Sequence, residues 1–159
     1  MKPSLRAGAA AITIDPPLGL PMSGVVRRDW AARGRIGHLE TSAIVLDCDG
    51  TRQVLCGVDT LAIQSPEIDV LRARVAEATG AEAAAVLINF SHTHHAPPGG
   101  RTVCGSFGER DPEPDAATLA YIESLHQRVV DVCTLASRRL EPAWVRWGLG
   151  VADRAYNRR

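Results

Sequence analysis

The fold is decided by residues 53–89, which read QVLCGVDTLAIQSPEIDVLRARVAEATGAEAAAVLIN. The segment begins with a β-branched apolar run that ends at Val58, and it closes on a second apolar run over residues 84–89. Between them, Ser65 before a proline and a glutamate predicts a helix start with Ser65 as the capping residue, and Gly80 predicts the helix end. Strand, helix and strand predict a βαβ unit, whose second strand we expect to be buried on both faces. We expect the helix to bury one face, formed by Ile68, Leu71, Val75 and Ala78.

Further elements flank this unit. The Asp49-Gly50 pair tolerates positive φ at both turn positions and separates residues 41–47 from residues 53–58, so we expect an antiparallel hairpin. Residues 6–14 predict another strand, and the periodicity of residues 116–140 predicts a long amphipathic helix. Residues 143–151 predict a final, Trp-rich strand. The fold class is therefore α/β, a mixed sheet containing a βαβ unit with flanking helices.

Composition and charge exclude several classes of protein. The 159 residues carry 18 Lys and Arg against 18 Asp and Glu, and 45% of them are hydrophobic, which is typical of a single globular domain. The charge balance argues against nucleic acid or an anionic membrane as partner, and no run approaches the ~20 apolar residues that span a bilayer. The four cysteines show no C-x-x-C spacing, so we expect buried free thiols and a cytoplasmic location.

Three of the five histidines gather in residues 89–100, NFSHTHHAPPGG, directly after the second strand of the βαβ unit. In an extended segment His92 and His94 point to the same side, where they either bind one metal ion or divide into one ligand and one proton carrier. Neutral imidazole suits both roles near neutral pH. Gly99 and Gly100 let a substrate approach the backbone. The alternative is that the clustered histidines are solvated and have no functional role.

Asp59 follows the first strand of the βαβ unit, as His92 follows the second. Parallel strands joined by a crossover end at the same sheet edge, where ligands of α/β proteins bind. We therefore expect Asp59 and His92 at that edge, with the Asp59 carboxylate orienting one of the imidazoles. The alternative is that Asp59 makes only a helix-side or turn hydrogen bond.

Four stretches, in this order, resemble the N-terminal part of the neutral/alkaline, non-lysosomal ceramidases: residues 9–24, 38–46, 54–61 and, above all, 88–100. The resemblance extends, with gaps, from Arg6 to Arg158. It implies a zinc-dependent amidohydrolase that cleaves the N-acyl amide bond of ceramide or a related lipid amide. It also implies that residues 1–159 are an incomplete N-terminal portion of a larger catalytic domain, because the family's remaining zinc ligands lie beyond the length of this chain.

The family also suggests roles for individual residues. Its zinc is held by two His, a Glu and a Tyr, and the first of these ligands falls on His92. The next His of the same loop lies near the reacting amide and falls on His94, which would take a proton from water or deliver one to the leaving amine. A later Asn-Arg pair that binds the substrate falls on Asn157 and Arg158, with Arg158 a candidate contact for the developing oxyanion. Where the family has Ser-Gly-Pro-Gly-Gly, residues 95–100 read HAPPGG and predict a stiffer, bulkier loop.

Two other functions stay open on the sequence. A different metal-dependent hydrolase of small amides or esters would use both His92 and His94 as ligands. A non-catalytic metal- or lipid-binding fragment would fold and bind metal weakly, without turnover. The sequence makes no prediction of an oligomeric state.

Overall fold

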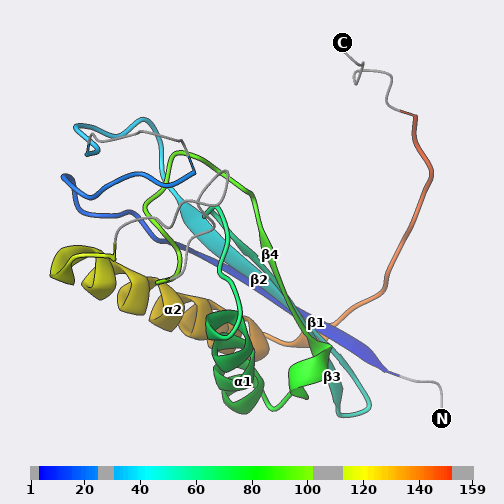
Figure 1. Cartoon of the computed structure of the whole chain (residues 1–159). Coiled ribbons are helices and arrows are strands. Elements are labelled where there is room, and N and C mark those ends of the chain that lie inside the picture. The colour runs from blue at the N-terminus through cyan, green and yellow to red at the C-terminus, as the bar shows by residue number, and fades with distance from the viewer. Residues whose placement is uncertain (1–3, 25–30, 102–112, 152–159) are drawn as a thin grey trace.

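The computed structural model describes residues 4–24, 31–101 and 113–151, which form one mixed sheet with two helices against one of its faces (Figure 1). The five strands lie in the order β4-β3-β2-β1-β5, with β3 and β4 parallel and the other neighbours antiparallel. This is the predicted α/β class. No helix in these residues is long and apolar enough to cross a membrane. The strands are β1 Leu5–Thr13, β2 Glu40–Cys48, β3 Thr51–Val58, β4 Val86–Phe90 and β5 Glu141–Pro142.

The β2–β3 hairpin forms as its turn residues predict. Asp49 and Gly50 have φ values of 52° and 88°, the left-handed conformation that a tight hairpin turn of this twist requires. The Asp47 carboxylate fastens the turn, since it accepts hydrogen bonds from the Gly50 N–H at 3.1 Å and from Arg52 Nε at 2.8 Å. The hairpin is therefore specified by residues adjacent in the sequence.

Helix α1, Glu67–Thr79, connects β3 to β4 and completes the predicted βαβ unit. It ends at Gly80, whose φ of 71° is the left-handed conformation common after a helix. Its start differs from the prediction. Pro66 occupies the capping position, because the Ser65 hydroxyl donates to the Asp69 carboxylate instead of accepting from a helix N–H.

The hydrophobic core lies between the sheet and the helices. Helix α2, Ala116–Ser137, begins where the Asp115 carboxylate accepts from the Thr118 N–H at 2.8 Å, and it corresponds to the predicted long amphipathic helix. On α1 the prediction is wrong for Ala78, which is exposed. Thr79 is buried instead, because it continues the four-residue spacing of the buried face. Both layers contribute fully buried side chains: Val45, Val54, Leu71, Val75, Val129 and Val132.

The prediction that the second strand of the βαβ unit is buried on both faces is wrong. β4 is the outermost strand of the described sheet, and its burial alternates, with Val86 and Ile88 buried but Leu87 exposed. Because the helices cover one face of the sheet, only every second side chain reaches the core. The residues before the strand, Ala83–Ala85, form a 3₁₀ helix rather than part of it.

The final strand predicted over residues 143–151 is not formed. β5 pairs with Arg6 and Ala7 of β1, and the Ala143 N–H makes one further hydrogen bond to the Leu5 carbonyl. Residues 144–151 have no strand partner within the described parts of the chain. They leave the sheet on the side away from the helices (Figure 1), with Trp144 and Trp147 69% and 87% exposed. A strand needs a neighbour for its backbone N–H and C=O groups, so an apolar pattern alone does not produce one.

The outer face of the sheet carries exposed apolar side chains and is not covered by the described residues. Ile44, Leu55 and Leu87 lie on three adjacent strands and are 46%, 41% and 56% exposed. Apolar patches of this kind promote association with other surfaces. The outer face is therefore expected to drive self-association of the isolated chain.

Replacing Leu55 and Leu87 together with threonine should reduce self-association of the concentrated protein, measured by light scattering. The free energy of unfolding should change by less than about 0.5 kcal/mol, because both sites are surface positions. Val54→Thr is the matched control on the inward face of the same strand. It should cost about 1–3 kcal/mol, because it buries a hydroxyl group. If the double variant self-associates as much as wild type, another surface of the protein causes the self-association.

Candidate functional site

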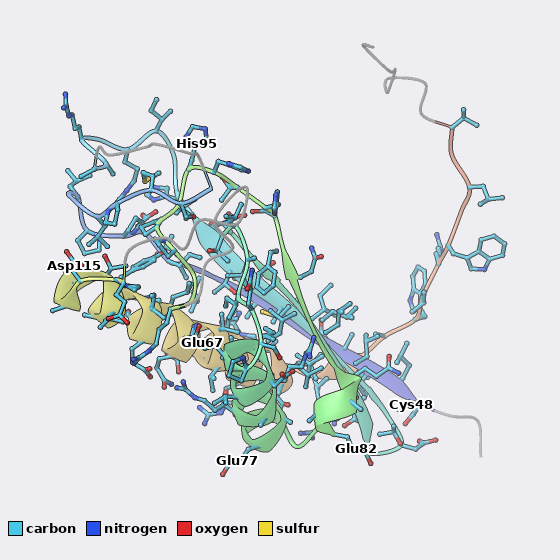
Figure 2. The ribbon with its side chains drawn as sticks, in the orientation of Figure 1. Cys48, Glu67, Glu77, Glu82, His95 and Asp115 are labelled. Carbon is cyan, nitrogen blue, oxygen red and sulfur yellow. The ribbon has the colours of Figure 1, made fainter. Side chains whose placement is uncertain are left out.

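The loops that follow β3 and β4 start at the same edge of the sheet. Val58 pairs with Phe90 at the end of the parallel register, so Asp59 and the loop of residues 91–101 leave from neighbouring points. The prediction that Asp59 and His92 share this edge is confirmed. We call residues 91–101 the histidine loop; Figure 2 labels His95 among the loops at this end of the sheet.

His92 is held in a defined orientation. Its φ of 57° is left-handed, so the histidine loop turns at this residue instead of remaining extended. The imidazole Nδ1 donates to the Leu61 carbonyl oxygen at 3.1 Å. Because a carbonyl only accepts, Nδ1 carries the proton and Nε2 of the neutral ring keeps its lone pair. Metal-binding histidines are commonly oriented in this way, so His92 Nε2 is suited to binding a metal ion.

His94 lies beside His92. Their ring centroids are 5.4 Å apart and the ring planes meet at 77°. The expectation that they share one side assumed an extended backbone, whereas the structure brings them together through a turn. His94 also packs against Gly24, where a Cβ atom would lie 2.8 Å from the His94 Nδ1. The two imidazoles are therefore adjacent, and a second loop supports one of them.

This second loop is fastened to the histidine loop through Ser23. The Ser23 N–H and hydroxyl both donate to the Ala96 carbonyl oxygen, at 2.9 and 3.2 Å. Ser23 is buried, so these hydrogen bonds are shielded from water. The sequence gives no sign of this contact, because Ser23 and Ala96 are far apart in the chain.

Asp59 is hydrogen-bonded across the sheet to the first residue of β2, rather than within a turn or to a helix. Its carboxylate accepts from the Glu40 N–H at 3.0 Å, and its own N–H donates to the Glu40 carbonyl at 2.9 Å. These bonds fix the start of β2 beside the end of β3. That Asp59 orients an imidazole stays a prediction.

Gly99 and Gly100 form what we call the glycine turn, and both are buried. A Cβ atom on Gly99 would lie 2.6 Å from the Thr60 hydroxyl oxygen, and one on Gly100 would lie 2.6 Å from Glu67 Oε2. The Ala62 carbonyl oxygen would also lie 3.0 Å from a Cβ atom on Gly99, so packing inside the protein requires glycine there, whereas at Gly100 the end of the Glu67 side chain would have to move. Contact of these glycines with a substrate stays a prediction.

The donor types at this edge suit zinc, which binds imidazole nitrogen. A catalytic zinc takes about three protein ligands, and among the described residues no group of three or more His, Cys, Asp or Glu is arranged to hold a metal ion. Zinc binding thus stays a proposal in which His92 is one ligand. The predicted substrate residues Asn157 and Arg158 lie outside the described residues.

A charged cluster at the same edge was not predicted. The Asp15 carboxylate accepts from the Leu39 N–H at 2.9 Å and from His38 Nδ1 at 2.7 Å, and it pairs with Arg35 at 3.0 Å. These contacts, the His38 hydrogen bond foremost, hold the pKa of Asp15 below its usual value of 3.8. The sequence shows the Asp-Pro-Pro turn after the first strand, but it does not show which residues surround the carboxylate.

Acid should remove the stabilising effect of Asp15. Since its pKa is lower in the folded state, the contribution is fully present above its unfolded pKa of about 4 and is lost as the pH falls through the folded value. We expect Asp15→Asn to lower the free energy of unfolding at neutral pH and to weaken its decline in acid. Urea unfolding at several pH values measures both effects, with Glu77→Gln on the exposed side of α1 as control. Parallel pH profiles of wild type and Asp15→Asn would contradict the assignment.

Comparisons with known proteins find the same fold within parts of two solved ceramidase structures. No protein-family model and no curated protein sequence matches the chain. The crystal structure of neutral ceramidase from Pseudomonas aeruginosa is similar, with a TM-score of 0.64 and 18% identity over 89% of this chain and 23% of that chain. A ceramidase complexed with C2 has a TM-score of 0.65 and 17% identity over 89% and 22%. The chain therefore shares the fold of a part of these enzymes and spans less than a quarter of their length.

Proposed function

We propose that this chain is part of a zinc-dependent amidohydrolase of the neutral ceramidase type, acting on the N-acyl amide bond of ceramide or a related lipid amide. The observation that carries the proposal is the orientation of His92. Its Nδ1–H donates to the Leu61 carbonyl, so the lone pair of Nε2 is available to bind a metal ion. The fold shared with solved ceramidases supports it.

Each residue of the site then has a role. His92 holds the zinc together with ligands from outside the described residues. Zinc, when bound, acts as a Lewis acid that activates water and polarises the amide carbonyl. His94, next to His92, carries the proton from water to the leaving amine. Arg158 and Asn157, which lie outside the described residues, are assigned to substrate binding, with Arg158 as the candidate contact for the developing oxyanion.

A second candidate is a different metal-dependent hydrolase of small amides or esters, in which both His92 and His94 bind the metal. The 5.4 Å between the two ring centroids supports this second candidate, because imidazoles this close can bind a common metal ion. For both candidates we propose a cytoplasmic location, based on the free cysteines Cys48, Cys56 and Cys133.

A substrate panel separates the candidates. Long-chain ceramide, short-chain ceramide and short acyl amides are assayed with protein isolated from its source cells by an antibody to this segment, and its mass is compared with the 17.0 kDa of this chain. The ceramidase-type function predicts the highest kcat/KM for the long acyl chain. Preference for short amides would support the second candidate. Zinc binding without turnover of any substrate would indicate a binding fragment and contradict both.

A further inference from the structure

The glycine turn is held by three elements of the fold. His126 Nε2, on α2, donates to the Gly99 carbonyl oxygen at 2.8 Å. The Glu67 carboxylate, in the first turn of α1, accepts from the Arg101 N–H at 2.7 Å. Thr60, in the loop after β3, fills the space that a Gly99 side chain would need. The end of the histidine loop is therefore packed against both helices and the sheet edge.

The His126 contact is the most constrained of the three. The residue is only 7% exposed, and a buried polar group is costly unless it is hydrogen-bonded. Its partner is a carbonyl oxygen, which only accepts, so Nε2 carries the proton and the tautomer is fixed. Since α2 is a long helix packed on the sheet, this donor fixes the position of a loop atom relative to the core.

Residues 60–62 connect the glycine turn to His92. The Leu61 carbonyl accepts from His92 Nδ1, at the start of the histidine loop. On either side of Leu61, Thr60 and Ala62 lie against Gly99, where a Cβ atom would be 2.6 Å from the Thr60 hydroxyl and 3.0 Å from the Ala62 carbonyl. One short segment thus touches both ends of the histidine loop, so movement of Gly99 would also move the support of His92.

We propose that His126 is a positioning residue of the histidine loop. By holding the Gly99 carbonyl it keeps the loop in the conformation that places His92 and His94 together before any ligand binds. The loop is then a preorganised wall of the site rather than a segment that closes over the substrate. This inference rests on the proposed function only where it concerns the ligand of the loop. The position of the loop itself can be measured without a ligand.

Amide hydrogen exchange of the complete chain tests the proposal. His126→Leu removes the donor, and His126→Gln restores an N–H near the Nε2 position. The Arg101 N–H donates to Glu67 and the Ser23 N–H donates to the Ala96 carbonyl, so both amides report on the position of the histidine loop. Their exchange should accelerate about tenfold in His126→Leu, because that is the effect of losing one ordinary hydrogen bond. His126→Gln should return the rates close to wild type. Ser124→Ala, on the exposed side of α2, is the control and should leave both rates unchanged.

Zinc titration gives a second result. His126→Leu should bind zinc about tenfold more weakly than wild type, which is the lower end of the losses seen when a residue that orients a metal ligand is removed. His126→Gln should restore the affinity for zinc. If wild type binds no zinc, the proposed function fails while the exchange rates still decide this inference.

Equal exchange rates in wild type and His126→Leu would overturn the proposal. Should His126→Leu fail to fold, nitrogen-15 NMR of the wild-type imidazole decides it. The proposal requires a protected Nε2–H, and a ring protonated at Nδ1 alone would overturn it.

Discussion

Zinc affinity should fall by more than about 100-fold when His92 is replaced with asparagine, because loss of an outer partner of a ligand already costs about 10–100-fold and this change removes the ligand itself. Asparagine is the sharper choice than alanine. It tolerates the left-handed φ of 57° that His92 adopts, so the backbone of the histidine loop is preserved while the imidazole is removed. Metal analysis after dialysis and calorimetric titration measure the loss, and amide hydrolysis should disappear with it.

His95 supplies the matched control. It lies in the same loop and is exposed, and its backbone N–H, which His95→Ala retains, donates to the Thr93 hydroxyl at 3.2 Å. His95→Ala should therefore bind zinc as wild type does. If His92→Asn kept its zinc and its amide hydrolysis, His92 would not be a ligand, and the interpretation of these histidines as solvated residues without function would be favoured.

The parts of the fold that follow from the sequence are those whose cause lies within a few residues. The Asp49-Gly50 turn depends on the φ values that two adjacent residues tolerate, and Gly80 ends α1 for the same reason. The shared edge of Asp59 and His92 follows from connectivity, because a helix between two strands makes them parallel. Such features need no knowledge of which residues become neighbours in space.

The features that were mispredicted depend on neighbours that the sequence does not show. The apolar run that becomes β4 has the composition of a strand buried on both faces, but no described helix covers the outer face of the sheet, so Leu87 is exposed. Residues 143–151 alternate like a strand, yet beyond Ala143 no described strand pairs with them. The Ser65 hydroxyl had two acceptable partners, and the side chain of Asp69 took the place of the helix backbone.

The site divides along the same line. The pair His92 and His94 was identified from spacing, although a turn, not an extended strand, brings the rings together. The two residues that support the loop, His126 and Ser23, were missed. His126 contacts the histidine loop only after α2 packs on the sheet, and Ser23 contacts it only after the loop that follows β1 folds onto the sheet edge. A lone histidine in a helix gives no signal that a carbonyl 27 residues away will accept a hydrogen bond from its N–H.

Gly8→Ala should destabilise the protein by about 3 kcal/mol or more, at the upper end of the cost of overpacking a core. Gly8 lies on the inward face of β1, where the end of α2 crosses the strand. A Cβ atom at this position would lie 2.1 Å from the Ala136 carbonyl oxygen and 2.9 Å from the Arg139 carbonyl carbon. Both are backbone atoms, so relief requires that the helix end move away from the sheet and not merely that a side chain rotate. Urea unfolding monitored by circular dichroism measures the loss.

The helix end cannot move freely, because other contacts fasten the same region to β1. The Arg6 guanidinium donates to the Leu140 carbonyl at 2.6 Å, and the Ala143 N–H donates to the Leu5 carbonyl at 3.0 Å. Gly34→Ala is the control: a Cβ atom there meets no other atom within 4 Å, and the change should alter stability by no more than about 1 kcal/mol. Equal stability of Gly8→Ala and Gly34→Ala would show that α2 does not approach β1 this closely. Since α2 also carries His126, displacement of this helix in Gly8→Ala should also accelerate hydrogen exchange of the Arg101 amide. Such an effect would show that packing at one end of the sheet influences the histidine loop at the other end.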